Sequence, residues 1–370
     1  MQIGQRIAQI QQAVSPGWFT SVMGTGILAI CLKLSPLQIP GFATISLALW
    51  SGDAVMLGGL LLLWLAQALR YPSRIRASFA DANHAQLWGA PPMACFTIAT
   101  GFLVIGNQVL PENIVLLSAQ ILWLVGVVGS LFCVLMVPYL MFTSHTLTAE
   151  TTYGNWLLPV VPPIVASVPG ALLATHWPEG WGSGFLALTY ALWGMGIALA
   201  AIIIVLFYSR LTYHKIPAGP LVPTLWIVVG PLGQSIAGIN ALGTAAPALW
   251  PTLGPTLRAA GLVYGLPVWG FGVYWLILAI LVTLRAAQRH LPFNLGWWAF
   301  TFPVGVLTTG TYALYTRTHS PFFLGAGVAL LGLLALMWAL VTLHTLGLMG
   351  RSFRREPILL APEISMAGAE

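Results

Sequence analysis

Residues 292–310 read PFNLGWWAFTFPVGVLTTG, an apolar run that carries a proline and glycines where a plain membrane span would carry leucines. A proline inside a helix removes one hydrogen bond and clashes with the carbonyl four residues back, so this run predicts a helix that kinks near Phe302. The backbone groups freed by Pro303 cannot face lipid and must face protein or a water-filled path. Two interpretations follow: the wall of a pore plugged by an aromatic ring, or a kinked helix whose aromatic side chains simply pack inside a bundle.

The composition of the whole chain agrees with a membrane location for this run. Of 370 residues, 58% are hydrophobic and 6% are charged, against about 25% charged in soluble domains. The mean hydropathy is +0.88, and the apolar runs are continuous rather than alternating, which excludes a β-barrel. We therefore expect an all-α integral membrane protein. The sequence indicates no cleavable signal peptide, cofactor or nucleic-acid partner. It also indicates no metal site, because the three cysteines all lie inside apolar runs.

Ten apolar segments of membrane-spanning character can be drawn along the chain. They cover residues 16–34, 43–69, 89–109, 113–143, 155–176, 183–209, 219–246, 256–287, 294–316 and 320–349. The sequence thus predicts a ten-span transport domain over residues 16–349, preceded by a short segment, 1–15, and followed by a tail, 350–370.

The basic residues predict the orientation of these spans. Most of the 14 Lys and Arg fall in connections on the side of the N-terminus, whereas Lys33, Arg258 and Arg317 fall on the opposite side. Cytoplasmic loops carry the excess of Lys and Arg in membrane proteins, so segment 1–15 and tail 350–370 should both be cytoplasmic. We expect a multi-pass protein of the plasma (inner) membrane.

The spans alternate in character along the chain. Even-numbered spans are rich in leucine, whereas odd-numbered spans are interrupted by glycine or proline, at intervals of about 70 residues. The interrupting residues are Gly24, Thr25 and Gly26 in the first span, then Pro92, Pro163, Pro231 and Pro303. This period predicts five helical hairpins in a quasi-fivefold arrangement, with kinked odd helices lining a central pore and even helices outside. Thr308 is a further expected pore-lining residue, although proline and glycine are also frequent in ordinary membrane helices.

Two ionisable residues are candidates for proton coupling. Asp53 lies within the second span, where a carboxyl group is a functional candidate, or it forms a structural hydrogen bond to a neighbouring helix. His84 precedes the proline-containing third span. A membrane-embedded enzyme would need several His, Asp or Glu at one depth, and the sequence offers no such group, so we expect no enzyme.

Two motifs resemble one family of transporters. PGWFTSVMGTGI at residues 16–27 and FNLGWWAFTFP at residues 293–303 are similar to the first-span and ninth-span signatures of the tellurite-resistance/dicarboxylate transporter family. That family includes slow-type anion channels, malic-acid transporters and sulfite exporters. The resemblance implies a homotrimer in which each protomer has its own pore, five kinked inner helices, and a phenylalanine that plugs the pore. Phe302 is the residue that matches this gate.

The function expected from these observations is anion transport across the membrane. The leading hypothesis is a carrier or channel for C4-dicarboxylates such as malate, or for small inorganic anions such as chloride, nitrate or sulfite, gated by Phe302. The alternative is a proton-coupled dicarboxylate symporter, or an exporter related to sulfite or tellurite, with Asp53 or His84 as the titrating group. Small anions, membrane lipid and further copies of the chain are the expected partners.

Overall fold

The computed structural model describes residues 15–354 except 38, 179, 218 and 290, and this part of the chain is helical and contains no strand. Eight stretches within it are long and apolar enough to cross a membrane, which confirms the all-α membrane fold. They are Pro16–Leu34, Phe42–Arg70, Ala82–Gln108, Glu112–Thr143, Trp181–His214, Gly219–Leu249, Gly254–Ala287 and Pro321–Gly350. Segments 155–176 and 294–316 are divided into shorter helical pieces, so the ten-span count stays a prediction. Almost all of segment 1–15 and most of tail 350–370 lie outside the described residues.

Five segments form the interior of the bundle. They are α2 (Phe19–Leu34), α6 (Ala90–Val104), α8 (Pro162–Val165) with α9 (Ser167–Leu173), α11 (Thr224–Ile227) with α12 (Val229–Leu249), and α14 (Phe302–Thr318). Each packs against the next in chain order, and α14 returns to α2, so the inner segments close into a ring. In the three that are long enough to span by themselves, between 67% and 89% of the residues in an 18-residue apolar stretch are buried.

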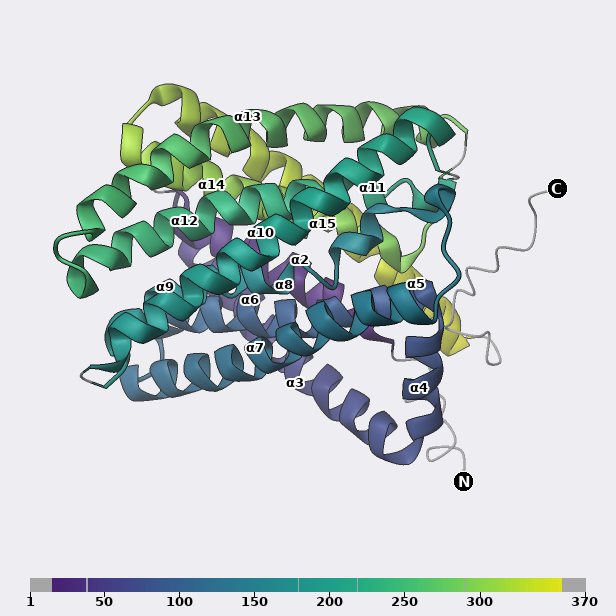
Figure 1. Cartoon of the computed structure of the whole chain (residues 1–370), viewed down its shortest axis with the longest axis horizontal. Coiled ribbons are helices and arrows are strands. Elements are labelled where there is room, and N and C mark those ends of the chain that lie inside the picture. Colours follow the sequence, from purple (N-terminus) through teal and green to yellow (C-terminus); the bar gives the residue numbers. More distant parts are fainter. Residues whose placement is uncertain (1–14, 38, 179, 218, 290, 355–370) are drawn as a thin grey trace.

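Five long helices surround this ring. They are α3 (Phe42–Arg70), α7 (Glu112–Thr143), α10 (Trp181–His214), α13 (Gly254–Ala287) and α15 (Pro321–Arg354). Each contacts the inner segments on either side of it, for example α3 on α2 and α6, and Figure 1 shows α13 and α7 at opposite edges with α2 and α6 between them. Only 22% to 39% of the residues in an 18-residue apolar stretch of each are buried, and side chains such as Val55 and Phe142 are exposed. Such exposed apolar surface suits contact with lipid tails, and it agrees with the predicted division into inner and outer spans.

The prolines of the inner segments act differently from the sequence prediction. Pro303 does not kink a continuous helix. A 3-10 helix, Leu295–Phe300, ends just before Thr301, and α14 begins at Phe302 with the proline in its first turn. Pro92 and Pro163 lie in the first turns of α6 and α8 in the same way, and Pro231 lies in the first turn of α12. The N–H groups of a first turn have no partner within the helix, so a proline there removes no hydrogen bond.

The glycines of the first span also have another role than the predicted interruption. The helix α2 runs unbroken through Gly24 and Gly26. A Cβ atom on Gly26 would come within 2.6 Å of Asp53 Oδ2 and 2.7 Å of a Thr97 methyl carbon, and one on Gly24 would come within 2.7 Å of the Trp298 ring. These glycines therefore let α2 approach its neighbours closely, as small residues commonly do between membrane helices.

Two short helices, α4 (Pro72–Ala80) and α5 (Ala82–Gln86), fill the connection between the second and third spans. The ring of Phe79 in α4 stacks on Trp88 with centroids 4.2 Å apart, and Trp88 Nε1 donates to Ser78 Oγ at 3.0 Å. His145, just beyond α7, hydrogen bonds the Phe79 carbonyl at 2.8 Å. These contacts hold α4 against the end of the bundle that also carries the start of α2.

Candidate functional site

Two cavities lie inside the ring of inner segments. The first has a volume of about 770 Å³ and the second about 610 Å³. Residues from all five inner segments line the second cavity, and residues from four of them, together with the stretch just before α8, line the first. The first cavity takes the earlier residues of each segment and the second takes the later residues, as with Met93 and Thr97 of α6. The two cavities therefore follow one another along the axis of the bundle.

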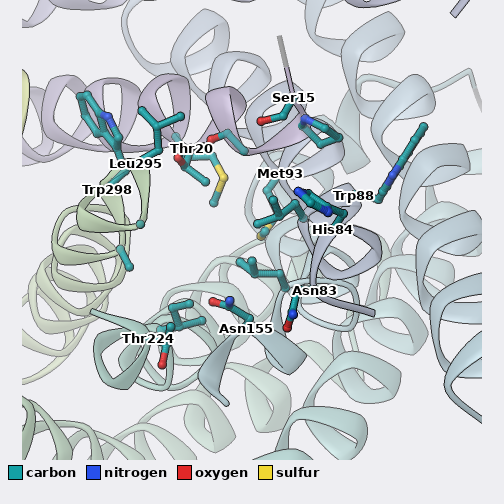
Figure 2. Close-up of a pocket in the computed structure, with 18 of the residues that line it drawn as sticks. Ser15, Thr20, Asn83, His84, Trp88, Met93, Asn155, Thr224, Leu295 and Trp298 are labelled. Atoms are coloured by element: carbon teal, nitrogen blue, oxygen red, sulfur yellow. Dashed lines mark hydrogen bonds between the residues drawn. The ribbon is translucent and has the colours of Figure 1, made fainter. Parts of the chain in front are cut away.

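Figure 2 shows the first cavity as an open space surrounded by side chains from distant parts of the chain. Thr20, Met93, Asn155, Thr224 and Trp298 come from the first, third, fifth, seventh and ninth expected spans in turn. The helices α4 and α5 and the end of α3 complete its wall. This cavity lies at the end of the bundle where the described chain begins.

The side chain of Phe302 is the only one, among the described residues, that lines both cavities. It is 6% exposed and occupies the first position of α14, directly after the break at Thr301. Phe300 turns away instead, because it packs edge-on against Trp226 with ring centroids 5.0 Å apart and lines neither cavity. One aromatic ring thus separates two spaces that are each large enough for a small anion.

The other predicted pore residues divide into two groups. Pro231 and Pro303 line the first cavity. Six others line neither cavity, and these are Gly24, Thr25, Gly26, Pro92, Pro163 and Thr308. Thr25 accepts a hydrogen bond of 3.0 Å from Trp338 Nε1 of the outer helix α15, and the fully buried Thr308 donates to the Val304 carbonyl. These residues therefore lie near the cavities, but most of them line neither cavity.

The two candidate titrating residues differ in burial and in their hydrogen-bond partners. Asp53 is 1% exposed and lines neither cavity, and both of its carboxyl oxygens lack a hydrogen-bond partner among the described residues. It lies beside Thr97, whose side chain lines the second cavity. His84 lines the first cavity, is half exposed, and pairs with Asp81 at 3.1 Å.

Five of the six threonine hydroxyl groups along the second cavity are already engaged. Each of the five donates its proton to a carbonyl of its own helix, and they are those of Thr97, Thr100, Thr244, Thr309 and Thr316. A hydroxyl in that state offers only oxygen lone pairs to the cavity, which do not attract an anion. Sequence inspection counts such threonines as polar lining and misses the direction of their protons.

Three further polar residues line the second cavity. Arg258 and Arg317, from α13 and α14, line it together, and the buried amide of Gln234 lines it in α12. In the sequence the two arginines lie at the outer ends of spans, where they either attract anions or act as ordinary interfacial anchors, and Gln234 carries no such signal; only packing brings the three to one space. Within the described part of the chain, no three His, Cys, Asp or Glu side chains come together as a metal site would require.

Comparison with known proteins agrees with this arrangement. The chain is 33% identical over 334 residues to a sulfite efflux pump of Trichophyton rubrum, covering 88% of each chain. It is 28% identical to an uncharacterised transporter of Methanocaldococcus jannaschii, covering 89% of this chain and 93% of the other. It is 22% identical to the malic acid transport protein of Schizosaccharomyces pombe, covering 88% of this chain and 76% of the other.

A family model described as voltage-dependent anion channel matches residues 13–346. The match covers both motifs that carried the resemblance, the ring of inner segments and both cavities, and the related proteins are named as transporters or pumps. The chain belongs to the voltage-dependent anion channel family.

Proposed function

We propose that this protein carries small anions across a membrane along the two cavities, with the ring of Phe302 as the gate between them. The observation that carries the proposal is that Phe302 alone lines both cavities within the described residues. The helices α6, α12 and α14 begin beside the first cavity. The N-terminal end of a helix carries partial positive charge, so these ends favour an anion approaching the ring.

Small inorganic oxyanions such as sulfite rank ahead of C4-dicarboxylates as substrates. The relatives named as sulfite efflux pumps reach 33% identity, whereas the relative named for malic acid reaches 22%. Both cavities have the volume for either ion, so size does not separate them. The proposal includes a homotrimer in the inner membrane, surrounded by lipid, with both termini in the cytoplasm.

Electrogenic flux in proteoliposomes tests the proposed function. We expect the protein to carry sulfite, with nitrate, chloride and malate giving smaller currents, and to need no proton gradient. Empty liposomes are the control, and each anion is supplied at one ionic strength so that screening is equal. Absence of flux for all four anions, from a protein that is folded and correctly inserted, would contradict the proposal.

A proton-coupled anion symporter is the second candidate, and the unpartnered carboxyl group of Asp53 favours it. An ionised carboxylate buried without a partner is very costly, and Asp53 lies beside Thr97, which lines the second cavity. His84, on the wall of the first cavity, is the other group that a coupled mechanism would use.

Asp53→Asn separates the two candidates. For the gated path that we propose, the substitution keeps the shape of the side chain and should change anion flux by less than about twofold at any imposed pH gradient. His84→Gln serves as the parallel variant on the other cavity. Sulfite or malate uptake that follows a proton gradient in the wild type and loses this dependence in Asp53→Asn would establish the symporter instead.

A further inference from the structure

We propose that Arg258 and Arg317 form an oxyanion-binding site in the second cavity, with Gln234 as the next hydrogen-bond donor toward the gate. The inference deepens the proposed anion path and rests on it for its role in transport. It concerns the end of the bundle where the inner helices finish, since Leu34, Val104 and Arg317 all lie near helix C-termini and line this cavity. Helix C-termini carry partial negative charge, so an anion would be repelled here without compensating cations.

The guanidinium group of Arg317 is hydrogen bonded through Nε and Nη2, whereas its Nη1 is hydrogen bonded by none of the described residues. Its Nε–H donates to Asn240 Oδ1 at 3.4 Å, and its Nη2 donates to the Asn240 carbonyl at 3.3 Å and to Thr244 Oγ1 at 3.0 Å. Asn240 is itself fixed, because its amide nitrogen donates to the Ile236 and Gly261 carbonyls. A guanidinium group has five N–H donors, so the two N–H groups of Nη1 remain available for a ligand.

Arg258 supplies a second positive charge to the same space. Its side chain is exposed, and within the described residues it has neither a hydrogen bond nor an ion pair. The charges of Arg258 and Arg317 act on each other, and no carboxylate is found among the described residues that line this cavity. Two like charges facing one space without a counter-ion are stabilised by an anion placed between them.

The remaining lining explains why the arginines decide what binds. Five of the six threonine hydroxyls of this cavity, all except Thr175, donate to their own helices and therefore offer an anion no proton. Gln234 is 5% exposed, lines the cavity, and its amide is hydrogen bonded by none of the described residues. The donors left without a described partner thus belong to the two arginines, Gln234, Thr175 and the Tyr312 hydroxyl, and only the arginines among them carry a positive charge.

The chemistry of these donors selects a class of ligand. The guanidinium group of Arg258, which is hydrogen bonded by none of the described residues, can present two parallel N–H bonds that match two oxygens of a carboxylate or a similar oxyanion, and Arg317 adds the N–H groups of its Nη1. A halide has a single centre and cannot use both bonds of the fork equally well. The site should therefore prefer sulfite or a carboxylate to chloride, and sulfite is the probe for the test.

Sulfite binding to the purified full-length protein, measured by isothermal titration calorimetry, tests the site directly. We expect Arg258→Gln and Arg317→Gln each to weaken sulfite affinity by about tenfold or more, the effect of losing one charge-assisted hydrogen-bonding group. Lys33→Gln is the matched control, because Lys33 also lies at the end of an inner helix but lines neither cavity. Equal sulfite affinity in the wild type, Arg258→Gln and Lys33→Gln would overturn the proposal.

Transport measurements distinguish failure of the site from failure of the path. If the site is used in transport, the sulfite concentration for half-maximal flux rises about tenfold in Arg258→Gln when sulfite enters from the side of the second cavity. Sulfite binding that is lost in Arg258→Gln, together with no flux in the wild type, would keep the site and overturn the proposed path. Should Arg317→Gln fail to fold, because Arg317 joins α12 to α14, Arg258→Gln decides alone, since the Arg258 side chain makes no hydrogen bond or ion pair with the described residues.

Discussion

Replacing Phe302 by Ala should raise anion flux in proteoliposomes by at least about tenfold, which corresponds to roughly 1.4 kcal/mol removed from the barrier to passage. The phenyl ring is the side chain common to both cavities, so its removal joins about 770 Å³ and about 610 Å³ into one continuous space. Because cavities already flank the ring, we expect a smaller loss of stability than the ~3–5 kcal/mol typical of a core Phe→Ala change.

Phe300→Ala is the matched control for this prediction. Phe300 lies two residues before Phe302, at the end of the 3-10 helix, is 3% exposed, and packs on Trp226 and Trp297 away from both cavities. Its truncation should lower thermal stability and leave flux per folded protein unchanged. Equal flux in Phe302→Ala and the wild type, with normal folding, would remove Phe302 as the gate. Increased flux in Phe300→Ala would show that general loosening, and not loss of a plug, opens the path.

Replacing Gly233 by Ala should destabilise the protein strongly, by about 2 kcal/mol or more, as overpacking of a tight interior does. A Cβ at this position of α12 would lie 2.6 Å from Leu307 Cα and 2.7 Å from the Val306 carbonyl carbon of α14. These are backbone atoms, which cannot rotate aside as a flexible side chain can. Gly310 of α14 returns the contact, since its Cβ would be 2.9 Å from the Gly233 carbonyl oxygen.

Gly230→Ala, one turn earlier in the same helix, provides the comparison. A Cβ there would meet Pro303 only at 3.9 Å, an ordinary contact. Alanine favours a helix over glycine by ~0.5–1 kcal/mol, so this variant should be neutral or slightly more stable. Thermal unfolding of both variants in the same detergent gives the test. Equal stability of Gly233→Ala and Gly230→Ala would contradict the close contact of α12 with α14.

Several features of the fold could be predicted from sequence because they depend on local patterns. The long leucine-rich runs indicate helices, and the expected segment 16–34 coincides with the observed span Pro16–Leu34. The proline period of about 70 residues predicted repeating hairpins, and the inner segments do close into a ring in chain order. The family resemblance matched Phe302, and not Phe300, to the gate, and the two rings do have different surroundings.

Other features depend on contacts between segments that are distant in the sequence, and local patterns could not supply them. A proline predicts a disturbed helix, but whether it kinks one helix or starts another depends on the chain before it, and at Pro303 a 3-10 helix precedes. A glycine predicts either a break or a close approach, and the neighbours of Gly26 show that it is the latter.

Composition and periodicity by themselves determined that the chain is an all-helical membrane protein with alternating inner and outer helices, because burial in lipid imposes its pattern on every turn of every span. Only the tertiary structure decided which polar groups face the cavities. The threonine hydroxyls turn to their own helices, whereas Arg258 and Arg317, 59 residues apart, come to line one cavity. The reason is physical: a hydroxyl finds its partner within its own turn of helix, but two arginines meet only when separate helices pack side by side.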